Sequence, residues 1–332
     1  MKLGILGTGM IVKDLLSTID QLNIEKIYLL ATEATKEEAE QLCKDYHLAG
    51  YVTDYDTLLD MDIDTIYVAL PNHLHYSFAK QALMRDKHVI IEKPVTSNAR
   101  ELKSLLAISR ERKKIMVEAM SIHYLPAFLS LKEKIASLGQ IKIVSFNYSQ
   151  YSSRYDAFKQ GHILPAFDYR KSGGALMDLN VYNLHAIVAL FGRPKAVQYL
   201  ANVENKIDTS GIMVLDYGSF KAVAIGAKDC KAPVMSTIQG DKGNIVMKMP
   251  VNGLRAYQLS DNAGHEQTLS FDDQTHRLFY EFKAFIEIIE QLDFVKAEKM
   301  LETSLIVSEV MEEGRKQQGI IFSADEEKKQ TA

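Results

Sequence analysis

One lysine stands where a proton could be moved or a substrate hydroxyl held. Lys93 follows the β-branched run Val89-Ile90-Ile91 and precedes Pro94. Such a run predicts a buried parallel strand, and the proline forces the chain to turn. Because ligands bind beyond the carboxyl ends of the strands in open α/β sheets, Lys93 is a candidate catalytic residue. Taken alone, Glu92-Lys93-Pro94 would instead indicate a surface turn.

A second group of polar side chains follows the glycine pair Gly173-Gly174. Asp178, Tyr182 and His185 are spaced by four and three residues, so we expect them on one face of a helix that ends near Gly192. Polar groups on the buried side of a helix need partners. Those partners are either a substrate or other parts of the protein, and for His185 the spacing favours a packing role.

The elements that would position these groups begin with an apolar run that ends in Gly7-Thr8-Gly9. Gly7 permits a tight turn, and Gly9 lets backbone N–H groups approach a pyrophosphate. A glycine pair is a weak signal by itself, but here an amphipathic segment follows it. A second apolar run ends about twenty residues later in Thr32-Glu33, where dinucleotide folds place the acid that binds the adenosine ribose. Glu33 could equally be a first-turn helix acid.

A third apolar run, 65–70, ends in Pro71-Asn72. Asn72 is a good helix N-cap type. His73 and His75 lie two residues apart and do not share a helix face, so we expect no metal site there.

The alternation of strand and helix patterns up to about Glu118 predicts an α/β domain with a Rossmann, doubly wound parallel sheet. After Pro126, strands joined by short turns predict an α+β domain with a large, mostly antiparallel open sheet. We expect these domains at 1–120 and 121–323, with a frayed tail at 324–332. The strand near 141–151 carries Val144, Phe146 and Tyr148 on one face, which predicts a homodimer or homotetramer formed through the sheet.

The composition excludes several classes of protein. The chain has 332 residues, 47% of them hydrophobic and 25% charged, as in ordinary globular proteins. A net charge of −4 gives no reason to expect nucleic acid or an anionic membrane as a partner, and no apolar run is long enough to span a bilayer. Cys43 and Cys230 predict reduced thiols and a cytoplasmic protein.

In their order and spacing, the motifs Gly7–Val12, Pro71–His75 and Glu92–Pro94 resemble those of the Gfo/Idh/MocA family of NAD(P)-dependent oxidoreductases. The family carries a further motif that matches 173–182, with a histidine or tyrosine at its end. Tyr182 is similar to the branch of the family that contains glucose–fructose oxidoreductase, xylose dehydrogenase and dihydrodiol dehydrogenase. Asn180 replaces a glycine of the motif, and asparagine tolerates unusual backbone angles.

The resemblance implies NAD or NADP as cofactor and a secondary alcohol or carbonyl of a small sugar or polyol as substrate. It implies Lys93, Tyr182 and Asp178 as catalytic residues, with His123 and His185 also near the substrate. The cofactor would contact Gly7, Thr8, Gly9, Met10, Ile11, Thr32, Glu33, Leu70, Pro71, Asn72, His75, Glu92 and Lys93. An acid at Glu33 favours NAD, because it would repel the 2′-phosphate of NADP.

Two other functions remain open. A non-catalytic dinucleotide-binding sensor of the same fold would not need Lys93, Asp178 and Tyr182 together. An enzyme similar to biliverdin reductase would need a wide apolar cleft and would not require Asp178.

Overall fold

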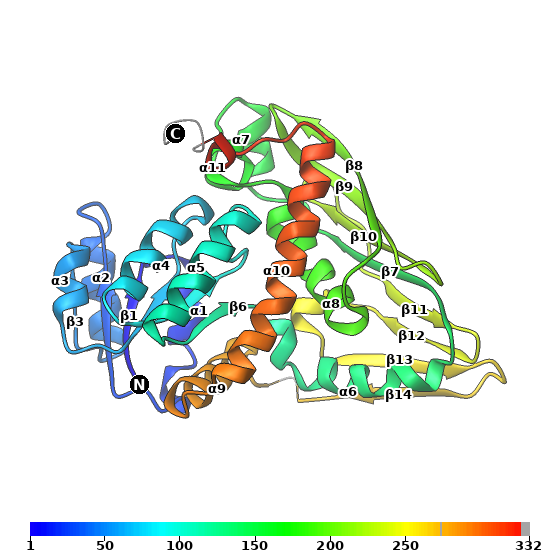
Figure 1. Ribbon diagram of the computed structural model, residues 1–332, viewed down its shortest axis with the longest axis horizontal. Helices are drawn as coiled ribbons and strands as arrows, with labels where there is room; N and C mark the ends of the chain where they lie inside the picture. Colours follow the sequence, from blue (N-terminus) through cyan, green and yellow to red (C-terminus); the bar gives the residue numbers. More distant parts are fainter. Residues whose placement is uncertain (273, 327–332) are drawn as a thin grey trace. The chain divides into compact units, whose positions relative to one another are not determined.

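The computed structural model describes residues 1–272 and 274–326, which form two compact units (Figure 1). The first unit contains Met1–Ala119 and His276–Glu302. The second contains Met120–Thr275 and the described residues from Thr303 onward. The sequence predicted a single boundary near residue 120, with segment 276–302 in the second domain. In the structure this segment belongs to the first unit, which is therefore discontinuous in sequence.

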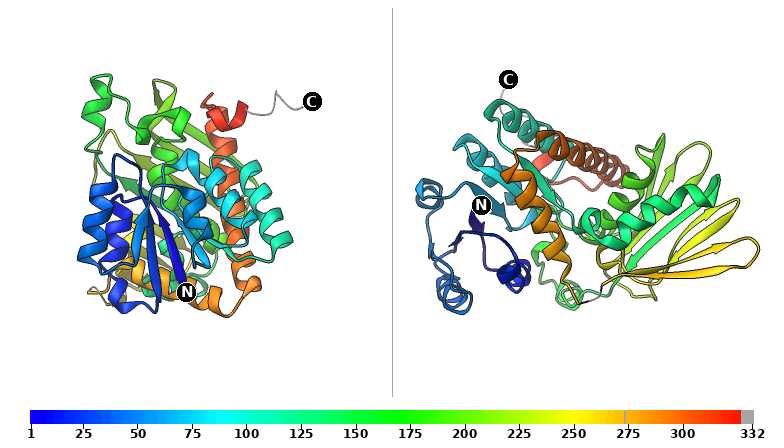
Figure 2. Two further views of the ribbon diagram at one scale, coloured as in Figure 1. Left: turned by 90° about the vertical axis from the view of Figure 1, so that its left-hand side faces the viewer. Right: turned by 90° about the horizontal axis from the view of Figure 1, so that it is seen from below.

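The first unit is built on a parallel sheet of six strands in the order β3-β2-β1-β4-β5-β6. Its strands are β1 (Lys2–Leu6), β2 (Lys26–Leu30), β3 (Gly50–Val52), β4 (Thr65–Val68), β5 (His88–Glu92) and β6 (Met116–Ala119). Its connecting helices are α1 (Met10–Leu16), α2 (Lys36–Asp45), α3 (Tyr55–Asp60), α4 (His75–Met84) and α5 (Ala99–Arg112). Figure 2 shows helices on both sides of these strands. The strand order reverses between β1 and β4, which confirms the predicted Rossmann sheet.

The later segment of the first unit contains α9 (Arg277–Glu290) and the beginning of α10 (Phe294–Gln317). The apolar stripe of α9 explains why it belongs here. Phe282 is fully buried, and its ring meets the ring of Tyr67 on β4 edge to face, with centroids 5.0 Å apart. A helix with such a stripe packs where apolar surface is available, and its place in the sequence did not reveal which sheet would offer that surface.

The second unit is built on a sheet of eight strands in the order β14-β13-β12-β11-β7-β10-β9-β8. Its strands are β7 (Ile141–Ser149), β8 (Ala196–Glu204), β9 (Ile207–Asp216), β10 (Lys221–Ala227), β11 (Ser236–Gly240), β12 (Gly243–Met247), β13 (Ala256–Asp261) and β14 (Glu266–Ser270). β7 and β10 pair in parallel, and the other neighbours are antiparallel, which confirms the mostly antiparallel sheet.

One face of this sheet is covered by helices. The helix α8 (Val181–Phe191) contacts β7 and β10, and α6 (Pro126–Lys134) contacts β13 (Figure 1). Val144 and Phe146 point to this covered face and are fully buried. Both residues were predicted to belong to an exposed association surface, and that prediction was wrong, because the alternate residues Ile143, Ser145 and Asn147 of β7 face outward instead.

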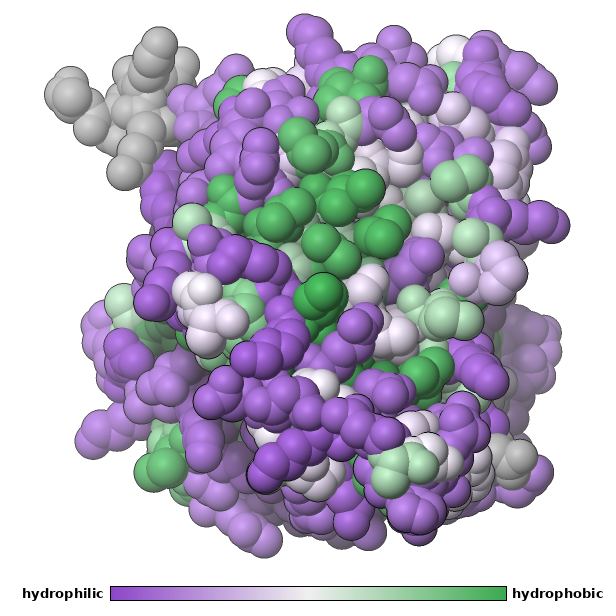
Figure 3. Space-filling model, turned by 90° about the vertical axis from the view of Figure 1, so that its right-hand side faces the viewer, coloured by the Kyte–Doolittle hydropathy of each residue, from purple (hydrophilic) through white to green (hydrophobic). Residues whose placement is uncertain are grey.

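The other face of the sheet is open in the described part of the chain. Leu200 on β8 and Ile212 on β9 are register partners and are 53% and 41% exposed. Ile225 on β10 follows in the same row, and Ile143 on β7 is 52% exposed. Figure 3 shows apolar side chains gathered on this side of the molecule.

The C-terminal part of the second unit is more ordered than its polar composition predicted. Residues Ser323–Glu326 form the short helix α11. The buried guanidinium of Arg315 on α10 pairs with Asp325, with N–O distances of 2.5 and 2.8 Å. The predicted frayed tail at 324–332 was therefore wrong for 324–326, and its remaining residues, 327–332, lie outside the described residues.

Candidate active site

The turn after β1 has the geometry expected for phosphate binding. Gly7 has φ +107°, and a side chain there would meet the carbonyl oxygen of Ala69 at 3.0 Å. A Cβ at Gly9 would meet no atom within 4 Å, so the space above this turn is open. Backbone N–H groups at such a turn can therefore be approached closely by a dinucleotide pyrophosphate. The hydroxyl of Thr8 donates to Glu38 at 2.5 Å, so Thr8 contributes backbone, not side chain, to this turn.

The end of β2 carries Thr32 and Glu33 just before α2. Glu33 lies outside the helix, and its carboxylate is 76% exposed and pairs with Lys36 at 3.1 Å. The hydroxyl of Thr35 accepts a hydrogen bond from the backbone N–H of Thr32 at 3.0 Å. The end of β2, where this fold binds the adenosine ribose, thus carries one carboxylate, one ammonium and two hydroxyls within a few residues of each other.

The end of β4 leads into a 3-10 turn, Asn72–Leu74, and then α4. His75, the first residue of α4, is fully buried. One ring nitrogen lies 2.9 Å from the carbonyl oxygen of Pro94, and the other lies 2.7 Å from that of Leu70. Burial lowers the pKa of His75, and these two acceptors raise it. The ring of His75 thus bridges two loops and holds them together, and its contact with the cofactor stays a prediction.

Glu92 and Lys93 diverge at the end of β5. The carboxylate of Glu92 points inward, where it accepts a hydrogen bond from the hydroxyl of Tyr67. Burial raises the pKa of Glu92, and this hydrogen bond opposes the shift. Burial also raises the pKa of Glu281 on α9 well above its ordinary value, with the Glu92 charge as the next cause. The contact between Glu92 and the cofactor stays a prediction. Lys93 is half-buried.

The segment after Lys93 is fixed by buried acids. Glu118 on β6 accepts from the backbone N–H of Val95 at 2.9 Å. Asn98 caps α5 by accepting from the N–H of Glu101 at 3.0 Å, and Glu101 accepts from the N–H of Ser97 at 3.0 Å. This arrangement is similar to a capping box, except that Glu101 accepts from the residue before the N-cap. The loop that carries Lys93 is therefore held at several points, as a catalytic group requires.

In the second unit, the glycine pair before the polar helix is required by close packing. A side chain at Gly173 would lie 2.6 Å from the carbonyl oxygen of Pro165. A side chain at Gly174, which has φ +102°, would lie 2.1 Å from a carboxylate oxygen of Asp208. That carboxylate accepts from the backbone N–H of Leu176 at 2.6 Å. Asp208, which the sequence analysis did not single out, thus anchors the start of the helical segment.

The helical segment itself differs from the regular helix that the spacing predicted. Leu176–Asn180 forms a π-helical turn, and α8 follows from Val181 to Phe191. Asp178 lies within the π-helical turn, a feature frequent at functional sites. Its carboxylate is 35% exposed and pairs at 2.7 Å with the ammonium of Lys228, which is 2% exposed. Lys228 lies fifty residues from Asp178 in the sequence and was not singled out in the sequence analysis.

Tyr182 and His185 both lie in α8 and are largely buried. The ring of Tyr182 lies beside that of Tyr148 on β7, with centroids 6.1 Å apart. His185 Nδ1 is 3.1 Å from Nε2 of His123, so one of these nitrogens donates to the other. The structure therefore gives His185 a packing partner, and the substrate contacts of His123 and His185 stay predictions.

Asn180 has ordinary helical angles, φ −71° and ψ −20°. The unusual backbone expected from the family's glycine is absent at this residue. Its side chain donates to the carbonyl oxygen of Ala224 on β10 at 3.0 Å and accepts from Asn183 at 2.9 Å. Strand residue Gly226 leaves room for it, because a Cβ at 226 would lie 2.7 Å from that of Asn180.

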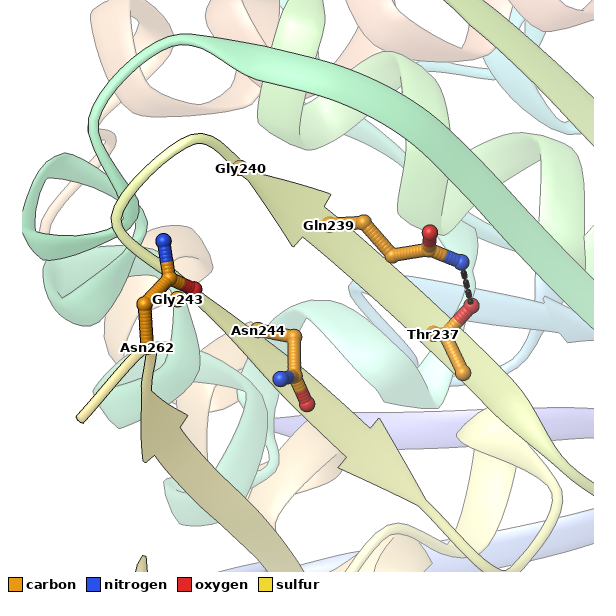
Figure 4. Close-up of a pocket in the computed structure, with 6 residues that line it drawn as sticks. All are labelled: Thr237, Gln239, Gly240, Gly243, Asn244 and Asn262. Atoms are coloured by element: carbon orange, nitrogen blue, oxygen red, sulfur yellow. Dashed lines mark hydrogen bonds between the residues drawn. The ribbon is translucent and has the colours of Figure 1, made fainter. Parts of the chain in front are cut away.

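Two other features of the described chain bear on the kind of site this protein has. No group of three or more histidine, cysteine, aspartate or glutamate side chains among the described residues could hold a metal ion. Figure 4 shows a shallow hollow lined by Thr237, Gln239, Gly240, Gly243, Asn244 and Asn262. Its side chains are neutral amides and a hydroxyl, which lack the acid and base that proton transfer needs.

These elements define a class of protein: an oxidoreductase with a Rossmann dinucleotide-binding unit and a second unit that carries an acid and a tyrosine on a helix. Residues 1–120 match the oxidoreductase family with an NAD-binding Rossmann fold. Residues 128–246 match the Gfo/Idh/MocA C-terminal domain. The chain belongs to the Gfo/Idh/MocA family of NAD(P)-dependent oxidoreductases.

Named relatives span nearly the whole chain. A scyllo-inositol 2-dehydrogenase (NADP(+)) of Bacillus subtilis is 32% identical over 98% of this chain and 99% of its own length. A D-xylose 1-dehydrogenase (NADP(+)) of Hypocrea jecorina is 23% identical over 97% of this chain and 93% of its own. A 3-ketoreductase from Actinomadura kijaniata, solved in complex with NADP, has the same fold, with a TM-score of 0.80 at 18% identity, covering 95% of this chain and 97% of its own.

Proposed function

We propose that this protein transfers a hydride between a nicotinamide dinucleotide and a secondary alcohol or carbonyl of a sugar or polyol. The observation that carries the proposal is the combination, in one chain, of Lys93 at the carboxyl end of β5 with Asp178 and Tyr182 on the helical segment of the second unit. A sensor would not need this combination, and a tetrapyrrole reductase would not need the acid. The inositol and xylose relatives support a polyhydroxylated substrate.

In this proposal each residue has a separate task. A bound nicotinamide supplies the acceptor or donor of hydride. Tyr182 moves the proton of the substrate hydroxyl, and the positive charge of Lys93 favours the deprotonated form of that phenol. Asp178 accepts a hydrogen bond from a second substrate hydroxyl, which fixes the substrate's orientation. His75 and Glu118 hold the loop of Lys93 in place.

The test is a turnover screen. The purified protein is incubated with NAD or NADP and a panel of inositols, aldoses and alditols, beginning with scyllo-inositol, and the reduced cofactor is followed by absorbance. We expect at least one polyol or sugar to be oxidised. A protein that binds dinucleotide but turns over no member of the panel would be a sensor, and reduction of biliverdin instead would support the reductase alternative.

Cofactor choice is our first specific prediction. The carboxylate of Glu33 should repel a 2′-phosphate, while Lys36 offsets part of that repulsion. We therefore expect NADH to bind about tenfold more tightly than NADPH. The two dissociation constants are measured by titrating the cofactor fluorescence. In Glu33→Gln, NADPH binding should strengthen and NADH binding should stay nearly unchanged.

Two relatives of this chain are named as NADP(+) enzymes, so a preference for NADPH is the alternative to be tested. Tighter binding of NADPH by the unaltered protein would contradict the predicted preference for NAD. It would mean that Lys36, together with Thr32 and Thr35, receives the phosphate. Lys36→Met should then weaken NADPH binding selectively, which separates the two explanations.

We also propose that two or four copies assemble through the open face of the second unit's sheet. Leu200, Ile212 and Ile225 form a continuous apolar row on that face, and such a patch is typical of association surfaces. Sedimentation should give a species heavier than the 37.4 kDa chain. Leu200→Lys should shift it toward monomer, whereas Leu129→Lys, an equally exposed leucine on α6, should not. Monomers alone at micromolar concentration would contradict the proposal.

We propose a cytoplasmic location, supported by two cysteines that are both free thiols in the structure. Within the described chain, the segment Tyr169–Phe191 is long and apolar enough to cross a membrane by length and composition. However, 72% of that window is buried inside the protein, as in a core helix.

A further inference from the structure

Lys228 is a buried charge that the proposed reaction does not yet use. It follows directly after β10, and its backbone is fixed on both sides, because its N–H donates to Thr209 at 2.8 Å and its carbonyl accepts from Ser152 at 2.9 Å. Its side chain is 2% exposed. A buried ammonium is costly unless it is paired and hydrogen-bonded, so its partners define its role.

Two segments of the chain contact the ammonium of Lys228. It donates to Asp178 in the π-helical turn at 2.7 Å and to the carbonyl oxygen of Ala166 at 3.0 Å. It also lies 4.5 Å from the centroid of the Phe167 ring, a favourable cation–π distance. Ala166 and Phe167 belong to a 3-10 turn, Pro165–Phe167.

The two members of the Lys228–Asp178 ion pair differ in their exposure to solvent. The ammonium is almost completely enclosed, whereas the carboxylate of Asp178 is 35% exposed. The lysine therefore approaches Asp178 from the interior and leaves the acid, not the base, accessible. A hydrogen bond to an ionised acceptor is stronger than one to a neutral acceptor, and a fixed carboxylate loses less conformational entropy when a hydroxyl binds.

We propose that Lys228 is a positioning residue: it holds Asp178 ionised and oriented so that this carboxylate accepts a hydrogen bond from a substrate hydroxyl. This inference rests on the proposed function, since it assigns Asp178 to the substrate. The turn Pro165–Phe167 helps to hold Lys228, because the same ammonium binds its carbonyl oxygen and its aromatic ring.

The experiment is a double-mutant cycle on kcat/KM with the best substrate of the screen. Asp178→Asn should lower kcat/KM roughly tenfold to a hundredfold, as expected when a charged hydrogen bond to substrate is lost. Lys228→Met should cost a similar factor, mainly in KM. In the Asp178→Asn background, adding Lys228→Met should change kcat/KM less than about twofold, because Lys228 acts only through Asp178.

The outcomes separate the two hypotheses. Full activity of Asp178→Asn would overturn the role of Asp178 in the proposed function, whatever Lys228 does. A large effect of Asp178→Asn with none of Lys228→Met would overturn only the positioning role. A further loss of fivefold or more in the double variant would show a separate structural role for Lys228 and would also overturn it.

Folding is controlled within the same set of variants. Lys228→Met alone leaves a partly buried carboxylate without this partner and could fail to fold, but the double variant removes both charges, which proteins tolerate better. If Lys228→Met does not fold but the double variant does, the double variant is compared with Asp178→Asn. Equal kcat/KM values support the proposal, and a kcat/KM of the double variant at least fivefold lower contradicts it. Binding of reduced dinucleotide should be unchanged in every folded variant, because neither residue belongs to the Rossmann unit.

Discussion

Lys93→Met should lower kcat by roughly 10² or more while the protein still binds its dinucleotide, because the change removes a proton-transfer charge and leaves the cofactor turn intact. Methionine keeps an unbranched side chain of similar length. The loop should keep its conformation, because three contacts hold it. Glu118 accepts from the backbone N–H of Val95, Asn98 caps α5, and a ring nitrogen of His75 lies within hydrogen-bond distance of the carbonyl oxygen of Pro94. Steady-state kinetics with the identified substrate, and titration with reduced cofactor, measure the two effects separately.

The matched control is Lys44→Met. Lys44 lies on α2, is 66% exposed and pairs with Glu40 four residues before it, so its loss should leave turnover unchanged. Full turnover of Lys93→Met on the same substrate would show that Glu92-Lys93-Pro94 is a structural turn. The proposed mechanism would then be wrong.

Tyr182→Phe should cost a similar factor, roughly 10² or more in kcat, because it deletes only the hydroxyl that would carry the proton. The ring beside Tyr148 is retained, so α8 should keep its packing on β7. If Lys93 and Tyr182 act as a unit, the double variant should lose less than the product of the two single losses. The cycle is measured on kcat at saturating substrate.

For this experiment the control is Tyr46→Phe, a half-buried tyrosine at the end of α2 in the first unit. Losses that multiply fully in the double variant would mean that the two residues act independently. Unchanged kcat in Tyr182→Phe would leave Lys93 alone as the proton carrier.

Much of the first unit could be predicted from the sequence, because local patterns specify it. The apolar runs before Gly7, Pro71 and Lys93 are buried parallel strands, and the turns after them follow at the expected places. The sequence could not show which way a motif's side chains point. The inward orientation of Glu92 toward Tyr67, and of His75 toward the two loop carbonyls, could only be seen in the structure.

The second unit was harder to predict because its key contacts are distant in sequence. Lys228 and Asp178 meet only when β10 lies beside the π-helical turn. Asp208 is a second example, because it is buried and accepts hydrogen bonds from Tyr199 and from the distant backbone N–H of Leu176.

The discontinuous first unit has a consequence for synthesis on the ribosome. Strands β1 to β6 emerge early, but the helix that covers Tyr67 with Phe282 and brings Glu281 close to Glu92 lies beyond residue 275. Until that helix emerges, the nascent chain carries an uncovered apolar surface, the kind of surface that chaperones bind. The nucleotide-binding unit is thus completed only after residues 276–302 have been translated, so a fragment that stops at residue 119 would lack part of its own core.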